Sequence, residues 1–202
     1  MKPKVLIIII LITVLEPSCH KYTYFELTDT DINMIPYKLE QTVNFIDSLG
    51  QNFVMTVKED NNTWELQSDI EKGEYRIVRL QSEQSSLSFK LSVSGSDRMS
   101  YYGILDVYIK PFCYLISYNK DGQFTTGNAY SSTKQYYHNS LEINNTIYYN
   151  VVEYIKVETF GYYDENKAMD SLPMRLLYNK TEGILQLEDK DKVLFSIENK
   201  DD

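Results

Sequence analysis

Residues 86–93, SLSFKLSV, alternate between apolar and polar side chains without a break. Successive side chains of a β-strand point to opposite faces, so the four apolar residues of this run share one face. The serines and Lys90 share the other face. A period of two is typical of a strand that covers a core on one side, and the pattern therefore predicts a strand over Ser86–Val93.

Short runs rich in Val, Ile, Tyr, Phe and Thr recur about every ten residues along the chain, as in an all-β protein. The other predicted strands are Thr42–Ile46, Phe53–Val57, Thr63–Gln67, Glu74–Gln81, Tyr101–Ile109, Cys113–Tyr118, Val151–Glu158, Met174–Tyr178, Ile184–Glu188 and Val193–Ile197. Polar clusters between these runs predict turns, among them Glu59–Asn62, Asn119–Gly122 and Asn144–Asn145.

No amphipathic helix of useful length is present, and a parallel sheet would need crossover helices. The sequence therefore predicts an all-β fold: a single antiparallel β-barrel or β-sandwich of about 10–12 short strands, with one short helical turn near the N-terminus. That turn is expected in Thr28–Ile35, where capping residues come first and Pro36 follows. We expect this segment to fold as a plug onto the core.

The first residues resemble an export signal. Lys2 and Lys4 precede Val5–Leu15, an apolar run of eleven residues interrupted only by Thr13. Such a run rises about 16 Å as a helix, whereas a bilayer core is about 30 Å thick. A short apolar segment behind positive charges is typical of a secretory signal peptide, which we expect over residues 1–18.

Cys19 is the predicted lipid-attachment site. Ser18 and Leu15 fit a bacterial lipoprotein signal, whereas Glu16 and Pro17 depart from it. The alternative is ordinary cleavage near Ser18, which would leave a free thiol. Acylation, for example with palmitate, would make the membrane a partner of the chain through Cys19.

The predicted organisation has four parts. Residues 1–18 form the signal peptide, 19–21 a lipid-attachment tether, 22–198 one all-β domain and 199–202 an acidic tail. His20 follows the cysteine in place of the aspartate that resembles an inner-membrane retention cue, so we expect the outer membrane and leave its periplasmic or surface face open.

Acidic composition excludes one class of partner. The formal net charge is −9, and the signal segment with Lys2, Lys4 and Glu16 contributes +1, so the remainder carries −10. Such a chain repels phosphate backbones, and no basic stripe is present, so nucleic acid is not an expected partner. If Cys19 is lipidated, Cys113 has no partner for an intramolecular disulfide, and the fold depends on burial.

A family resemblance appears after the predicted tether. YFELTDTD (Tyr24–Asp31), MIPY (Met34–Tyr37) and QTVNF (Gln41–Phe45) resemble the start of small lipoproteins from Bacteroidota-type bacteria. The segments Leu177–Ile184 and Leu194–Ser196 look similar to the ends of those chains. The resemblance implies a lipidated envelope protein. The family has no assigned activity, so it implies no catalytic residue.

Two sequence triplets suggest O-glycosylation. Asp47–Ser48–Leu49 and Asp170–Ser171–Leu172 resemble the acidic, hydroxyl, aliphatic triplet that Bacteroidota-type cells O-glycosylate on exported proteins. Both lie in predicted loops, so Ser48 and Ser171 are candidate O-glycosylation sites.

Few residues suit catalysis. His20 would sit in the tether, and His138 lies in a polar stretch that we interpret as an exposed loop. No catalytic or nucleotide-binding motif is present. Cys113 lies in an apolar run and is interpreted as an inert small hydrophobe. Asp29 and Asp31 begin like a calcium loop, but helix capping explains them better, so no metal or cofactor is expected.

Tyrosine is the main argument for a binding role. The chain has 18 tyrosines, several of them adjacent. Adjacent tyrosines of a strand point to opposite faces, and outward rings either stack on sugars or form an interface, whereas the alternative is simple half-burial. Tyr136, Tyr137, Tyr162 and Tyr163 are the candidate contact residues, and Trp64 is expected in the core.

These observations predict a non-enzymatic, lipid-anchored envelope protein that serves as a binding or structural module. Its expected partners are a glycan or another envelope protein. The alternative function is a glycan-acting hydrolase or lyase that uses carboxylates and tyrosines.

Overall fold

The structure is a computed structural model that describes residues 22–68, 71–84, 86–95, 102–109, 112–125, 133–156, 175–189 and 192–198. The predictions for the signal peptide, Cys19, Tyr162, Tyr163 and Ser171 lie outside the described residues. So do those for the acidic tail.

Within the described residues the chain forms twelve strands and one short helix. They are β1 (Thr23–Phe25), α2 (Asp29–Ile32), β2 (Thr42–Asp47), β3 (Asn52–Ser68), β4 (Glu71–Ser82), β5 (Ser88–Ser94), β6 (Tyr102–Ile109), β7 (Phe112–Asn119), β8 (Thr133–Ile143), β9 (Thr146–Lys156), β10 (Arg175–Asn179), β11 (Gly183–Asp189) and β12 (Lys192–Ile197). The all-β prediction is confirmed.

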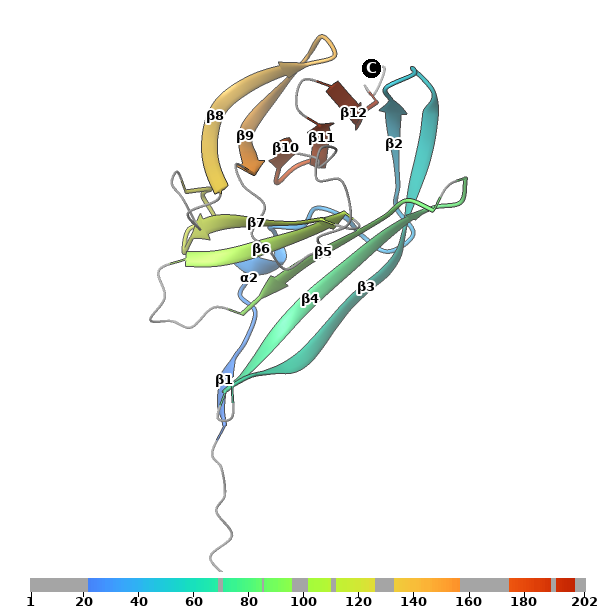
Figure 1. Cartoon of the computed structure of the whole chain (residues 1–202). Coiled ribbons are helices and arrows are strands. Elements are labelled where there is room, and N and C mark those ends of the chain that lie inside the picture. Colours follow the sequence, from blue (N-terminus) through green and yellow to red (C-terminus); the bar gives the residue numbers. More distant parts are fainter. Residues whose placement is uncertain are drawn as a thin grey trace, which may run out of the picture.

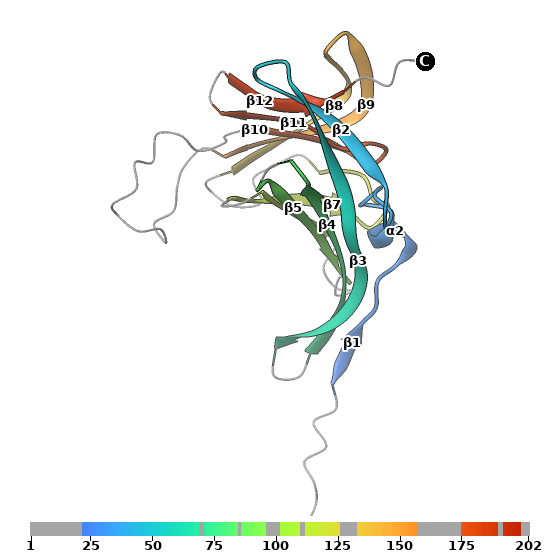
Figure 2. The same cartoon turned by 90° about the vertical axis from the view of Figure 1, so that its right-hand side faces the viewer.

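One curled sheet contains all the described strands. Its order is β7-β6-β5-β4-β3-β2-β12-β11-β10-β9-β8, with antiparallel neighbours throughout, and β1 pairs in parallel with β4 beside this path. The sheet bends back on itself into a nearly closed barrel (Figures 1 and 2). Of the two predicted architectures, the continuous sheet corresponds to the barrel rather than to two stacked sheets.

The alternation in β5 builds the core as predicted. Phe89, Leu91 and Val93 are buried. The Phe89 ring lies 5.8 Å from that of Phe45 on β2 and 5.3 Å from that of Phe195 on β12. Three strands that are distant in sequence therefore meet in one aromatic cluster, which stabilises the curled sheet through apolar burial.

Gln135 joins the two ends of the sheet, β7 and β8. Its side-chain oxygen accepts a hydrogen bond from the Ser117 amide at 3.0 Å. Its side-chain nitrogen donates to the carbonyl oxygens of Ser117 and Thr125, at 2.8 and 2.6 Å. Gln135 is 4% exposed. A buried side-chain amide on β8 thus hydrogen-bonds backbone groups of β7 and of Thr125.

The predicted helical turn is α2. Thr28 is its N-cap: the Asp31 amide donates to the Thr28 hydroxyl at 3.2 Å, and the Thr28 amide donates to the Asp31 carboxylate at 2.9 Å. This reciprocal capping box satisfies donors that have no partner inside the helix. Met34, Ile35 and Tyr37 follow and are at most 2% exposed. The N-terminal plug prediction is confirmed.

Arg76 on β4 fastens this plug. Its guanidinium donates to the carbonyl oxygens of Ile32, Ile35 and Tyr37 at 2.7, 2.8 and 2.7 Å. It also donates two hydrogen bonds to the Asp60 carboxylate, at 2.9 and 3.0 Å. A guanidinium has five N–H donors, so this buried cation is fully satisfied.

Buried tyrosines make further contacts around the plug. The Tyr118 hydroxyl donates to Asp31 at 2.7 Å, and the Tyr178 hydroxyl donates to the Met34 carbonyl. The Tyr37 hydroxyl accepts from the Ile184 amide at 2.7 Å. Burial, the largest cause in each case, raises the pKa of all three phenols well above the ordinary value near 10.

These raised pKa values predict a loss of stability at alkaline pH. Above about pH 10 the unfolded tyrosines lose protons that the folded ones keep, so the free energy of unfolding falls as pH rises, by at most about 1.4 kcal/mol per pH unit for each phenol. Thermal unfolding between pH 8 and pH 11.5 measures this slope. Tyr118→Phe should make it shallower. An equal slope in Tyr118→Phe would contradict the prediction.

The turn predicted at Glu59–Asn62 is wrong. These residues lie inside β3, which continues to Ser68 and pairs with β4 along most of its length, with a register shift between Val57 and Glu59. Polar residues are tolerated here because their side chains are half-buried or exposed. In addition, the Asp60 carboxylate pairs with Arg76 across the two strands.

Trp64 is not a core residue, contrary to prediction, and Cys113 is exposed although it lies in a predicted apolar strand. Trp64 lies on the extended part of β3 and is 46% exposed. Cys113 is exposed because Tyr114, Ile116 and Tyr118 occupy the core-facing positions of β7, which leaves the alternate positions on the outside.

Candidate functional site

The stretch around His138 is a strand, so the predicted loop is wrong. It belongs to β8, which pairs with β9 from Thr133 to Ile143. The hairpin turns at Asn144 and Asn145, whose φ angles of 52° and 63° suit the tight two-residue turn of the predicted position. Asn, Ser and His are weak strand formers, and only the pairing with β9 makes this segment extended.

The β8–β9 hairpin arches so that its turn lies next to β12 (Figure 1). The Asn144 side chain donates to the Ser196 hydroxyl at 2.7 Å. Ile143 and Tyr148 next to the turn are buried, whereas Tyr149 is 65% exposed. Tyr148 is buried and Tyr149 is exposed, as expected if adjacent tyrosines of a strand point to opposite faces.

Below this turn, an ion-pair row crosses the strands β8 to β11. We name it the polar row and define it by His138, Glu153, Arg175 and Glu188. His138 Nε2 lies 2.6 Å from Glu153 Oε2, and Arg175 Nε lies 2.6 Å from Glu153 Oε1. The guanidinium also donates to both oxygens of Glu188, at 3.0 and 2.9 Å. The Gln186 side chain donates to Glu188 as well.

The polar row is partly shielded from water. The Glu153 and Glu188 side chains are each 12% exposed, whereas those of His138 and Arg175 are about one-third exposed. Burial alone would lower the pKa of Arg175, but hydrogen bonds and charges from Glu188 and Glu153 outweigh it and raise that pKa. Both carboxylates accept charge-assisted hydrogen bonds from one guanidinium, which holds them in a fixed arrangement.

This arrangement suits recognition better than proton transfer. A glycosidase needs one carboxyl group that can donate a proton, whereas here both carboxylates are paired with the Arg175 cation. Fixed polar groups with partial exposure can instead hydrogen-bond the hydroxyls of a ligand without reorganising.

Arg175→Gln should destabilise the fold by about 1–3 kcal/mol at pH 7, because two shielded carboxylates lose their cation. Urea unfolding of the variant and the natural protein at pH 7 measures the difference. Lys58→Gln, which breaks the exposed pair with Glu83, should cost less than about 1 kcal/mol. Equal losses in Arg175→Gln and Lys58→Gln would contradict the assignment.

The predicted contact tyrosines separate. Tyr136 is opposite Glu153 in the β8–β9 register, so it lies on the face of the polar row, and it is 44% exposed. Tyr137 points to the other face, and its hydroxyl donates to the Asn150 side chain at 2.6 Å. Tyr162 and Tyr163 lie outside the described residues. Of the two predicted contact tyrosines in the described part of the chain, only Tyr136 lies beside the polar row.

Of the candidate modification sites, Ser48 lies in the described part of the chain. Ser48 lies in the exposed turn after β2, beside Leu49, which is 77% exposed. This position is accessible to an enzyme, and its O-glycosylation stays a prediction. Ser171 lies outside the described residues, as does Cys19.

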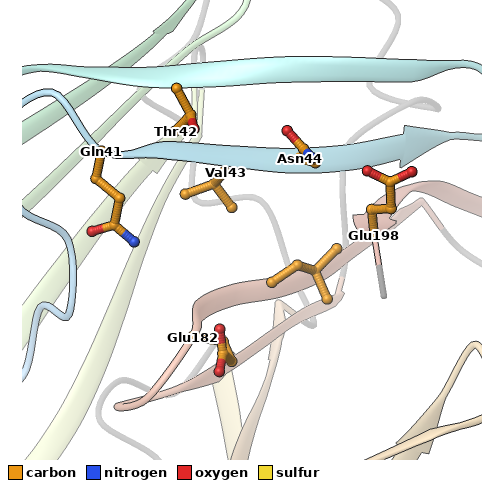
Figure 3. Close-up of a pocket in the computed structure, with 7 residues that line it drawn as sticks. Gln41, Thr42, Val43, Asn44, Glu182 and Glu198 are labelled. Atoms are coloured by element: carbon orange, nitrogen blue, oxygen red, sulfur yellow. The ribbon is translucent and has the colours of Figure 1, made fainter. Parts of the chain in front are cut away.

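A small pocket lies between β2 and the β10–β11 turn (Figure 3). Its volume is about 140 Å³, and its lining residues are Gln41, Thr42, Val43, Asn44, Glu182, Ile197 and Glu198. Ligand pockets are generally about 300–1,000 Å³, so this one is too small to enclose a sugar. Its two carboxylates, Glu182 and Glu198, are therefore poor candidates for the paired acids of a hydrolase.

Glu153, Arg175 and Glu188 carry no local signal that would mark them in the sequence. They are separated by 13 residues or more and lie in runs that read as ordinary strands. Only the register of β9, β10 and β11 brings them together, since Arg175 is opposite Glu188 and Ile155. The only indication in the sequence would have been that each of three predicted strands carries a charged residue, which could pair across neighbouring strands.

Neither metal ligands nor membrane helices are found in the described part of the chain. No group of three or more His, Cys, Asp or Glu side chains there is arranged to hold a metal ion. None of the helices in those same ranges is long and apolar enough to cross a membrane. In the comparisons with known proteins, no family model matches the chain, and no curated protein or solved structure is significantly similar to it.

Proposed function

We propose that this chain is a non-enzymatic, lipid-anchored glycan-binding module of the bacterial outer membrane. The observation that carries the proposal is the rigid polar row with the exposed Tyr136 ring beside it. Tyr136 offers an apolar face for a sugar ring, and the row offers both donors and acceptors for hydroxyl groups.

The start of the fold supports the anchor. Cys19 precedes Tyr22 by three residues, and β1 pairs with β4 from Thr23 onward. A lipid on Cys19 would therefore hold the barrel directly at the membrane through a very short tether. The resemblance to small Bacteroidota-type lipoproteins agrees with this location.

Metabolic labelling with a fatty-acid analogue tests the anchor. The natural chain should incorporate the label and fractionate with outer membranes, and Cys19→Ala should not incorporate it. Equal labelling of both chains, or labelling of neither, would contradict lipid attachment at Cys19.

Affinity electrophoresis in gels that contain envelope or dietary polysaccharides tests the binding surface. The detergent-solubilised protein should be retarded by at least one of them, and Tyr136→Ala should remove most of the retardation. Tyr24→Ala, at another exposed ring, on β1, is the matched control and should behave like the natural chain. Equal loss in both variants, or new reducing ends in the polysaccharide, would contradict the proposal, and the latter would favour the hydrolase alternative.

A further inference from the structure

The far end of the β3–β4 hairpin carries β1 as a third strand. β1 pairs with β4 through Thr23–Glu71, Tyr24–Lys72 and Phe25–Gly73. This three-stranded tip projects from the barrel at the end opposite the β8–β9 hairpin (Figures 1 and 2). The tip therefore contains the first strand of the described chain and is its most protruding part.

Register places the apolar side chains of the tip on one face. Leu66 and Tyr24 are both partners of Lys72, so the three side chains form a row across the strands. Trp64 is two residues before Leu66, and Tyr22 two before Tyr24, so they share that face. We call these five residues the aromatic tip face. Alternation puts Glu65 and Glu71 on the opposite face, whereas Glu74, the partner of Trp64, lies on the same face as Lys72.

The aromatic tip face is contiguous and exposed to solvent. The Tyr24 ring lies 5.6 Å from Trp64 and 6.4 Å from Tyr22, and Lys72 Nζ lies 4.5 Å from the centre of the Tyr22 ring. Tyr24, Trp64 and Leu66 are 58%, 46% and 64% exposed. Single exposed apolar residues are common, but a joined patch of this kind marks an interaction surface.

The rings and the cation on this face favour a lipid headgroup layer. Glu74, two residues after Lys72 on the same face, accepts hydrogen bonds from the Leu27 amide at 3.1 Å and from Asn62 at 3.0 Å, which hold its oxygens towards those groups. Lys72 is the cation that contacts the Tyr22 ring. Tyr and Trp prefer the interface between headgroups and acyl chains, and Lys at this depth reaches lipid phosphates.

Chain length ties the face to the anchor. Three peptide steps separate Cys19 from Tyr22, so their Cα atoms are at most about 11 Å apart. An acyl chain on Cys19 would thus place the bilayer surface next to the aromatic tip face and not next to another part of the barrel.

We infer that the aromatic tip face docks on the surface of the bilayer that holds the lipid anchor. The inference rests on the proposed lipid attachment at Cys19. Docking orients the barrel with the tip inserted at headgroup depth and the polar row directed away from the membrane.

Trp64 is the single tryptophan of the chain, so its fluorescence reports on the tip. Protein purified from membranes in detergent is reconstituted into vesicles of phosphatidylcholine and phosphatidylethanolamine, with and without brominated acyl chains. We expect a blue shift of Trp64 emission and quenching by bromine. Leu66→Asp and Tyr24→Ala should lose most of both signals, while Tyr136→Ala, at the opposite end, should keep them. Thermal unfolding of each variant verifies that the barrel is intact.

The two proposals fail separately. A chain that carries the fatty-acid label but shows no quenching of Trp64 keeps its anchor and overturns the docking. If the label is absent, the anchor fails, and the exported protein is added to the same vesicles from solution. Quenching there supports docking without an anchor, and its absence overturns docking. Equal quenching in Leu66→Asp and the natural chain would also overturn it.

Discussion

Replacement of Arg76 by alanine is expected to lower the free energy of unfolding by about 3–5 kcal/mol, because it leaves a shielded carboxylate and three plug carbonyls without their donor. The Asp60 side chain is 21% exposed, and that of Arg76 is 10% exposed. Small domains have a total stability of about 5–15 kcal/mol, so this loss is a large fraction of it. Urea unfolding followed by circular dichroism measures the change.

Arg79 provides a matched control on the same strand. It pairs with Glu59 across β3 and β4, but both side chains are about one-third or more exposed. Arg79→Ala should therefore cost less than about 1 kcal/mol. Arg76→Lys should recover only part of the loss, because an ammonium group cannot make the five hydrogen bonds of the guanidinium. If Arg76→Ala and Arg79→Ala cost the same, Arg76 does not fasten the plug.

Gly183→Ala is expected to destabilise the fold by about 2–5 kcal/mol, from a strained backbone and overpacking together. Gly183 has a φ of 83°, in the left-handed region. A Cβ atom there would lie 2.1 Å from the Tyr37 hydroxyl oxygen, which accepts the Ile184 amide. The methyl group would displace the Tyr37 ring and break that hydrogen bond.

Gly50→Ala separates the two contributions. Gly50 has a similar φ of 76°, but a Cβ atom there would meet nothing within 4 Å. Its substitution should cost only the backbone strain of about 1–2 kcal/mol. Thermal and urea unfolding of both variants measure the difference, and equal losses would show that the Tyr37 contact with Gly183 adds nothing.

The two proposed surfaces occupy opposite ends of the barrel. The aromatic tip face is built on β1, β3 and β4, whereas the polar row crosses β8 to β11, and both views place these strands at different ends (Figures 1 and 2). A barrel docked through its tip would therefore expose Tyr136 and the polar row to the compartment beyond the membrane. This geometry makes the anchor and the binding surface compatible in one molecule.

Several features could be predicted because they depend on neighbours in the sequence. Alternation placed Phe89, Leu91 and Val93 in the core, and capping residues identified α2. The Asn144–Asn145 turn is likewise recognisable from its side chains, which tolerate positive φ. Each of these is a local property of a few residues.

The failed predictions concern residues whose environment is set by distant strands. Glu59–Asn62 has the composition of a turn, yet pairing with β4 keeps it extended. His138 has the surroundings of a loop residue, yet it lies in β8 and pairs with Glu153. Trp64 has a large apolar side chain of the kind that usually lies in a core, yet its part of β3 extends beyond the barrel and the side chain is exposed.

Local patterning was thus sufficient for the all-β class, the strand periodicity, the capped turn and the expectation of an exported domain. The barrel closure through Gln135, the polar row and the aromatic tip face were decided only by the tertiary structure. The physical reason is that strand register is a long-range property. A strand's own sequence specifies which residues alternate, but only the neighbouring strands determine which side chains meet across the sheet.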